Sequence, residues 1–185
     1  VGNVGRKVVT AARALGMQVL QNDPPRAEAE GVQPFTPLAE LLASSDIITL
    51  HVPLSMSGPY KTYHLMDYKK MTQMKKGVVL INTSRGEVVD NKALKAAIIQ
   101  EFVDEAVLDV FENEPDIDKE LLCMLLLATP HIAGYSADGK ANGTAMSVQA
   151  ISRFFSLDYH NWYPKQVPEP ENPVISSLEH SPEDR

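Results

Sequence analysis

Three short apolar runs, separated by stretches of helical character, constrain the fold of this 185-residue chain more than any other feature. The runs lie at 47–52, 78–82 and 106–110, and helical patterns lie between them at 67–76 and 91–100. Strands that alternate with helices are typical of parallel sheets, because the chain must cross over before the next strand runs in the same direction. The sequence therefore predicts an α/β domain with a doubly wound parallel sheet.

The pattern extends toward the N-terminus. Apolar residues at helical spacing predict a helix over 4–15, and the run 17–20 is predicted as a strand that ends at Asp23. Pro24 and Pro25 follow, and prolines cannot continue a hydrogen-bonded ladder. A short helix is expected to begin at Pro37.

The C-terminal third is less regular. Residues 121–128 fit a helix or a strand, and we expect them to divide between the two, whereas 138–157 has a long helical pattern. Five prolines and many acids follow after residue 157, a composition typical of an extended arm that packs on a neighbour or stays mobile. We therefore expect a domain over 1–157 and a C-terminal tail over 158–185.

Two glycines at the start of the first predicted helix suggest a phosphate-binding turn. Gly2 and Gly5 have the spacing of the last two glycines of G-x-G-x-x-G, although such a pair can also serve helix packing alone. Asp23 lies 21 residues after Gly2, where a carboxylate would bind ribose hydroxyls. Together these features favour a Rossmann-type domain that binds NAD.

Each residue of this motif has a physical role. Gly2 lets a pyrophosphate approach the backbone, and the N–H groups of Asn3 and Val4 lie at the positive end of the helix dipole. Asp23 would repel the 2′-phosphate of NADP, although Arg26 weakens this preference. Because the motif normally follows a strand, we expect the chain to be N-terminally truncated.

Composition narrows the possible partners. The net charge of -7 disfavours nucleic acid and anionic lipid, since both require a basic face. No uncharged apolar stretch reaches the roughly 18 residues of a membrane span. The single cysteine, Cys123, cannot form an internal disulfide and favours a cytoplasmic location. We expect no metal site.

Three short segments lie at the ends of successive elements: NTSRG at 82–86, LDVFENEP at 108–115 and TPHIAGY at 129–135. With the glycine motif, they make the chain resemble the D-isomer-specific 2-hydroxyacid dehydrogenases. The resemblance implies NAD as cofactor and a second, N-terminal substrate domain, which should supply most substrate contacts. Without that domain, the chain alone is expected to be inactive.

The resemblance implies a catalytic role for one residue of each segment. Arg85 binds the substrate carboxylate and C2 oxygen, His131 exchanges the hydroxyl proton, and Glu114 pairs with His131. Separately, each could be an ordinary surface or structural residue, but separations of 29 and 17 residues agree with the family. Imidazole titrates near neutral pH, a carboxylate stabilises its protonated form, and guanidinium offers a fixed fork to a carboxylate. Glu112 does not match the family pattern and could be an ordinary surface acid.

The resemblance also implies contacts with cofactor and substrate at less distinctive positions. Cofactor contacts are implied at Gly2, Asn3, Val4, Asp23, Val52, Thr83, Ser84, Arg85, Asp109 and Gly134, and a substrate contact at Tyr135. For Asp109, the alternative is a strand-end acid that binds turn amides. His51 is expected to be structural or to line the adenosine pocket.

Three further segments are typical of one subfamily, which acts on a small phosphorylated 2-hydroxy acid as a homodimer. They are DPPR at 23–26, GPYKTYHL at 58–65, and HIAGYS at 131–136 followed by DGKA at 138–141. Two alternatives stay open. One is a relative acting on phosphoglycerate, hydroxypyruvate or glyoxylate, and the other is a nucleotide-sensing corepressor on the same fold.

Overall fold

The computed structural model describes residues 1–31 and 34–169. The chain divides into two compact units, Val1–His131 and a second that begins at Ile132, and each is described by itself. The expected division into a domain over 1–157 and a tail stays a prediction, and positions 170–185 of that tail lie outside the described residues.

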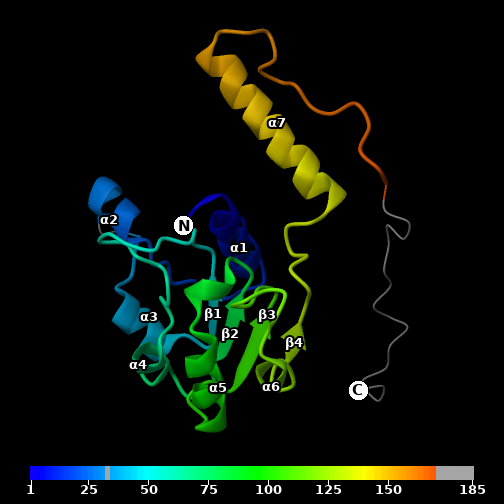
Figure 1. The fold of residues 1–185 in the computed structure, drawn as a ribbon. Helices are drawn as coiled ribbons and strands as arrows, with labels where there is room; N and C mark the ends of the chain where they lie inside the picture. The colour runs from blue at the N-terminus through cyan, green and yellow to red at the C-terminus, as the bar shows by residue number, and fades with distance from the viewer. Residues whose placement is uncertain (32–33, 170–185) are drawn as a thin grey trace. The chain divides into compact units, whose positions relative to one another are not determined.

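The first unit is built on a parallel sheet with strand order β1-β2-β3-β4 (Figure 1). Its strands are β1 (Ile47–Leu50), β2 (Val79–Asn82), β3 (Glu105–Leu108) and β4 (Leu127–Ala128). In register, Leu50 pairs with Asn82, Asn82 with Leu108 and Leu108 with Ala128. The carboxyl ends of all four strands therefore meet at one edge, as predicted for a doubly wound sheet.

Helices surround this sheet. They are α1 (Asn3–Ala14), α2 (Pro24–Glu30), α3 (Leu38–Ser44), α4 (Tyr68–Met71), α5 (Asn91–Ile99), α6 (Lys119–Leu122) and the 3-10 turn η1 (Gly86–Val88). Aspartates begin four of them, because a side-chain carboxylate can accept an otherwise unpaired N–H of the first turn: Asp23, Asp67, Asp90 and Asp118. The core between helices and sheet is apolar and includes Met66, Met71, Leu80, Leu94, Leu108 and Leu121.

The predicted strand at 17–20 is wrong. In the described part of the chain no strand pairs with it, and Met17 and Leu20 are 48% and 41% exposed. A strand needs a neighbour to accept its hydrogen bonds, and apolar content alone does not supply one. The two prolines that follow do not simply end a segment, because they form the first turn of α2, where backbone N–H groups have no helical partner.

The second unit contains α7 (Ala137–Phe154), which Ser136 caps by accepting the Gly139 N–H at 2.9 Å. After the helix, the chain turns back. The buried Ser152 hydroxyl donates to the carbonyl of Leu157 at 2.6 Å and accepts the N–H of Tyr159 at 3.0 Å. The helix therefore ends three residues before the predicted position 157.

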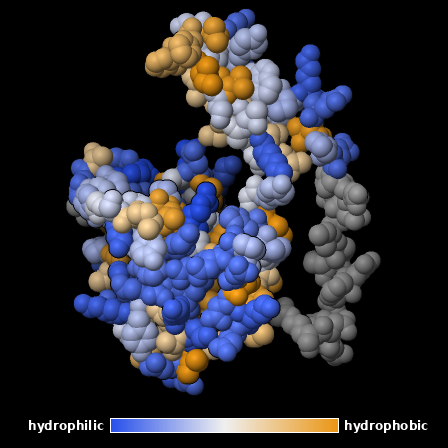
Figure 2. Space-filling view, viewed as in Figure 1, coloured by the Kyte–Doolittle hydropathy of each residue, from blue (hydrophilic) through white to orange (hydrophobic). Residues whose placement is uncertain are grey.

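The two units differ in surface character. Figure 2 shows mainly hydrophilic side chains on the visible face of the first unit, and apolar side chains at the end of α7. Phe154 and Phe155 there are 82% and 64% exposed. Among the described residues, no helix combines the length and apolar character that a membrane crossing requires.

Candidate active site

Arg85 follows β2 in a turn that a buried asparagine organises. The Asn82 amide donates to the Arg85 carbonyl at 2.9 Å, and its Oδ1 accepts both the N–H and the hydroxyl of Ser84. Asn82 is fully buried, so this short network fixes the backbone, whereas Arg85 itself is exposed. The turn therefore places Arg85 at the carboxyl edge of the sheet, where its guanidinium donates to the Ser84 carbonyl at 2.6 Å.

Gly86 connects this turn to the segment after β3. A Cβ atom at Gly86 would overlap the carbonyl group of Phe111 and would lie 2.7 Å from the backbone nitrogen of Glu112. Only glycine allows such an approach between two backbones. The packing thus holds the neighbouring Arg85 next to the segment that carries Glu114.

Glu114 and His131 form a hydrogen-bonded pair. His131 Nδ1 lies 2.7 Å from Glu114 Oε2, and the other oxygen of Glu114 accepts the Phe111 N–H at 2.8 Å. The backbone N–H of His131 donates to the backbone carbonyl of Asp109 at 2.8 Å, which anchors the histidine beside β3. Because Nδ1 is occupied by Glu114, Nε2 is the ring nitrogen suited to exchange a proton with a substrate.

The electrostatics of the pair agree with its geometry. Burial acts to raise the pKa of Glu114, but the hydrogen bonds from His131 and from the Phe111 N–H outweigh it and leave this pKa below its usual value. Asp109 acts in the opposite direction, because a nearby negative charge raises the pKa of Glu114. The side chain of Glu114 is 33% exposed and that of His131 is 51% exposed, so a ligand can reach the pair.

Asp109 lies at the carboxyl end of β3 and is 3% exposed. Its Oδ1 accepts the hydroxyl of Thr129 at 2.6 Å, which ties the segment before His131 to the sheet. This contact shows a structural function for the side chain. The cofactor contact expected of it stays a prediction.

The residues of the glycine motif lie at the start of α1. Gly2 is the N-cap residue, and within the described chain no side chain caps this helix and no acid lies in its first turn. A Cβ at Gly2 would have open space around it, whereas one at Gly5 would lie 3.2 Å from Val1 and 3.8 Å from the Cβ of His51. Gly5 therefore serves the close approach of α1 to the segment after β1, and Gly2 leaves room at the helix end.

Asp23 lies near the same place. Its carboxylate contacts the amino group of Val1 and accepts the Arg26 N–H at 3.3 Å, and Arg26 in turn donates to the Val1 carbonyl at 2.9 Å. The acid expected to bind ribose thus lies beside the segment that enters α1. The guanidinium of Arg26 is also hydrogen-bonded to Glu30, which offsets its positive charge.

Other candidate residues of the first unit have mainly structural contacts in this structure. Ser84 is 8% exposed with its hydroxyl bound to Asn82, and Thr83 is half-buried. Val52 packs against the core. His51 contacts the hydroxyl of Thr49 at 3.0 Å, and burial lowers its pKa, which agrees with the structural alternative.

Gly134 and Tyr135 belong to the second unit. Tyr135 is 67% exposed, and the ammonium of Lys140 lies 3.3 Å from the centroid of its ring. This cation–π contact orients the ring within its own unit. The expected roles of both residues stay predictions.

A second group of polar side chains was not predicted from the sequence. Glu112 is not an ordinary surface acid, because its side chain is only 17% exposed and its Oε1 lies 2.7 Å from Nε2 of His64. Its other oxygen accepts the Asn91 N–H at 2.8 Å. The sequence signal was the histidine in the segment GPYKTYHL, but only the fold shows that it meets Glu112, 48 residues later.

Comparison with known proteins shows the family of this chain. Residues 1–133 match the family described as D-isomer specific 2-hydroxyacid dehydrogenase, NAD binding domain. An erythronate-4-phosphate dehydrogenase from Bacteroides fragilis is 52% identical over 177 residues, which cover 96% of this chain and 50% of the relative. An Escherichia coli O157:H7 protein of the same name is 44% identical over 171 residues, or 92% of this chain and 45% of the relative. The chain thus spans about half the length of these relatives.

Solved structures are similar as well. A glyoxylate reductase from Paecilomyes thermophila superposes with a TM-score of 0.66 at 33% identity, over 84% of this chain and 46% of that one. A D-lactate dehydrogenase from Aquifex aeolicus, solved with NAD and lactic acid, gives a TM-score of 0.65 at 32% identity, over 84% of this chain and 51% of that one.

Proposed function

Since this chain belongs to the D-isomer specific 2-hydroxyacid dehydrogenases, as the NAD-binding domain of that family, we propose that the intact protein oxidises 4-phospho-D-erythronate with NAD. The product is 3-hydroxy-2-oxo-4-phosphooxybutanoate, and the reaction serves vitamin B6 biosynthesis. Support comes from relatives named erythronate-4-phosphate dehydrogenase at 44% and 52% identity. The segments DPPR, GPYKTYHL and HIAGYS favour the same substrate over phosphoglycerate or glyoxylate.

The observation that carries a dehydrogenase function is the contact between His131 Nδ1 and Glu114 Oε2 at 2.7 Å. Oxidation at C2 requires the hydroxyl proton to leave the oxygen while hydride leaves C2. Nε2 of a neutral His131 accepts that proton, and the carboxylate of Glu114 stabilises the imidazolium that forms. Arg85, an exposed residue, binds the substrate carboxylate and C2 oxygen through the fixed fork of its guanidinium.

The residues present fit NAD. Over the described residues, the N-terminus of α1 has no side-chain cap and no acid in its first turn, so its N–H groups can bind a pyrophosphate. Gly2, Asn3 and Val4 would hold this group and Asp23 the ribose, and Val52, Thr83, Ser84, Arg85 and Asp109 would line the rest. When bound, NAD supplies the acceptor for hydride.

A substrate panel tests the proposal in the intact protein. NAD reduction would be followed with 4-phosphoerythronate, 3-phosphoglycerate, D-lactate and glycerate at equal concentrations. We expect kcat/KM for 4-phosphoerythronate to exceed the others by at least about 100-fold, because an absent phosphate or an altered length would leave binding groups unpaired. If kcat/KM for another acid were equal or greater, the proposed substrate would be wrong and that acid would take its place.

Three wider expectations belong to the same proposal. A separate substrate domain of the intact protein would complete the cleft, with an NAD-binding domain over 1–157 and a tail over 158–185. The protein would be cytoplasmic, which the single free cysteine supports. It would also be a homodimer, which the exposed side chains of Phe154 and Phe155 support. Light scattering on the intact protein measures the oligomeric state directly, and a monomeric mass would contradict the homodimer.

A further inference from the structure

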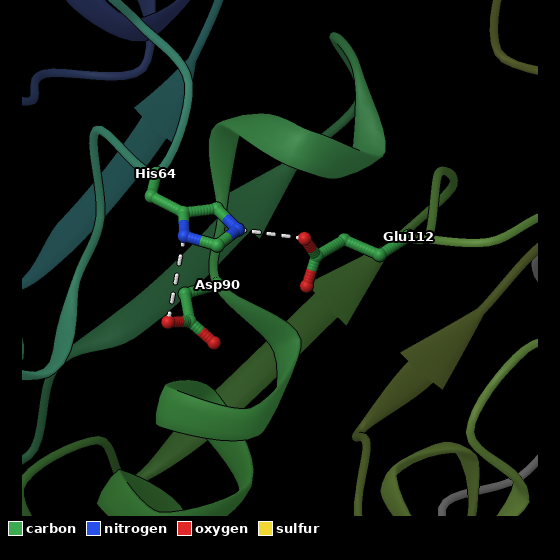
Figure 3. A group of neighbouring side chains, drawn as sticks. All are labelled: His64, Asp90 and Glu112. Atoms are coloured by element: carbon green, nitrogen blue, oxygen red, sulfur yellow. Dashed lines mark hydrogen bonds and ion pairs between the residues drawn. The ribbon is translucent and has the colours of Figure 1, made fainter.

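Three polar residues from different segments, His64, Asp90 and Glu112, lie close together (Figure 3). His64 lies between two carboxylates, with Nε2 at 2.7 Å from Glu112 Oε1 and Nδ1 at 3.6 Å from Asp90 Oδ2. Glu112 comes from the loop after β3, Asp90 caps α5, and His64 lies in the long loop between β1 and α4. The group therefore joins three loops.

A metal ion is one possible reason for such a group, because its ligand atoms lie within 4.8 Å of one another. Each acid, however, already has protein partners. Glu112 binds His64 through one oxygen and the Asn91 N–H through the other, and Asp90 accepts the Ala93 N–H at 2.9 Å. These contacts favour a structural link between the loops over a metal site.

Glu112 lies two residues before Glu114, so its contacts bear directly on the catalytic pair. The segment between them passes through Asn113, whose φ of 60° is unfavourable for most residues other than glycine. Just before Glu112, Phe111 donates its N–H to Glu114 and packs its carbonyl on Gly86. A shift of the backbone at Glu112 would therefore move both the Phe111 N–H and Glu114.

Building on the proposed dehydrogenase function, we propose that Glu112, held by His64, is a positioning residue for the Glu114–His131 pair. With both of its oxygens bound, Glu112 fixes the segment from which Glu114 reaches His131. When the link is lost, the segment gains freedom and the contact between Glu114 and His131 lengthens on average. The ring of His131 then loses part of the stabilisation of its protonated form, and catalysis slows.

NMR titration of the His131 ring in the intact protein tests this step without any substrate. The variants are Glu112→Gln and His64→Asn, each made with Glu114 intact and again with Glu114→Gln, and the signal is assigned by its loss in His131→Asn. Glu114 binds the ring through its side chain, and the negative charge of Asp109 acts on Glu114; both acids stay in the first set. Asp116→Asn, an exposed acid of the same loop, is the matched control.

We expect Glu112→Gln and His64→Asn to move the His131 titration midpoint toward acid by about 0.3 pH unit or more, a two-fold change in proton affinity. In the Glu114→Gln background the same changes should move it by less than about 0.1 unit, because the contact through which they act is already lost. Asp116→Asn should leave the midpoint in place. Equal shifts in both backgrounds would mean a direct charge effect, and no shift in either would mean no coupling; both overturn the proposal.

Kinetics and stability complete the test. Glu112→Gln should lower kcat at least ten-fold while KM for NAD stays within two-fold, and thermal unfolding confirms that each variant is folded at the assay temperature. A fall in melting temperature with an unchanged kcat would overturn the positioning role. Failure of 4-phosphoerythronate as substrate would leave the NMR result intact, so the two proposals fail separately.

Discussion

His131 Nδ1 lies 2.7 Å from Oε2 of Glu114, and the same glutamate accepts the Phe111 N–H through its other oxygen. One carboxylate thus orients the imidazole and is itself oriented by the backbone. This arrangement leaves Nε2 as the ring nitrogen available to a substrate, and it makes the behaviour of the pair testable through either partner.

Arg85→Lys should lose far more activity than conservation of charge suggests. An ammonium group cannot make the paired contacts that guanidinium makes with a carboxylate and the C2 oxygen. Loss of one charge-assisted hydrogen bond costs about 1.5–3 kcal/mol, or roughly one to two decades in kcat/KM. Steady-state kinetics on the intact protein measure the change, and kcat/KM within a factor of two of wild type would remove Arg85 from its assigned role.

Gly86→Ala should destabilise the first unit, because the added methyl group would overlap the Phe111 carbonyl and force two backbones apart. We expect a loss of about 1–3 kcal/mol in the free energy of unfolding, measured by denaturant titration. Gly143→Ala in α7 is the matched control, since its Cβ meets nothing within 4 Å and alanine favours a helix by about 0.5–1 kcal/mol. If Gly86→Ala were as stable as wild type, the close packing of the two loops would be disproved.

Sequence patterns predicted most of the sheet because buried parallel strands are short, apolar and flanked by helical periodicity. Ile47–Leu50 and Val79–Asn82 are examples. The same reasoning failed at 17–20, where apolar content suggested a strand but a strand also needs a neighbour to pair with. It failed again at α2, because a pair of prolines can end a strand or begin a helix.

The proposed catalytic residues could be named only through family resemblance. Arg85, Glu114 and His131 are common residue types, and nothing in their local sequence indicates that they lie close together. The roles of Gly86 and Glu112 were missed for a related reason. Both depend on contacts between segments distant in sequence, and such contacts leave no periodic pattern.

Asp23 should make the intact protein prefer NAD over NADP. The carboxylate lies beside the entry to α1, where it would repel a 2′-phosphate, and Glu30 offsets the charge of Arg26 that would attract one. Asp23→Ala should bring the dissociation constants for NAD and NADP closer together, as measured by fluorescence titration. Because Asp23 also caps α2, Asp67→Ala, which removes the cap of α4, controls for the loss of a helix cap. Equal binding of both cofactors by wild type would contradict the prediction.

Glu114→Gln should change both the pH dependence of turnover and that of stability. Oxidation needs a neutral His131, so its rate rises with pH, and loss of the carboxylate that stabilises the imidazolium should move this rise toward acid. Reduction needs the protonated ring, so the fall of its rate with pH should also move toward acid.

For stability, the pKa of Glu114 is lowered in the folded state, so the carboxylate stabilises the fold above its unfolded pKa and loses that effect as pH falls through the folded pKa. The stability gap between wild type and Glu114→Gln should therefore close in acid. Profiles of kcat/KM and denaturant titrations from acid to mildly alkaline pH measure both, and an unmoved rate profile would show that Glu114 does not act on His131.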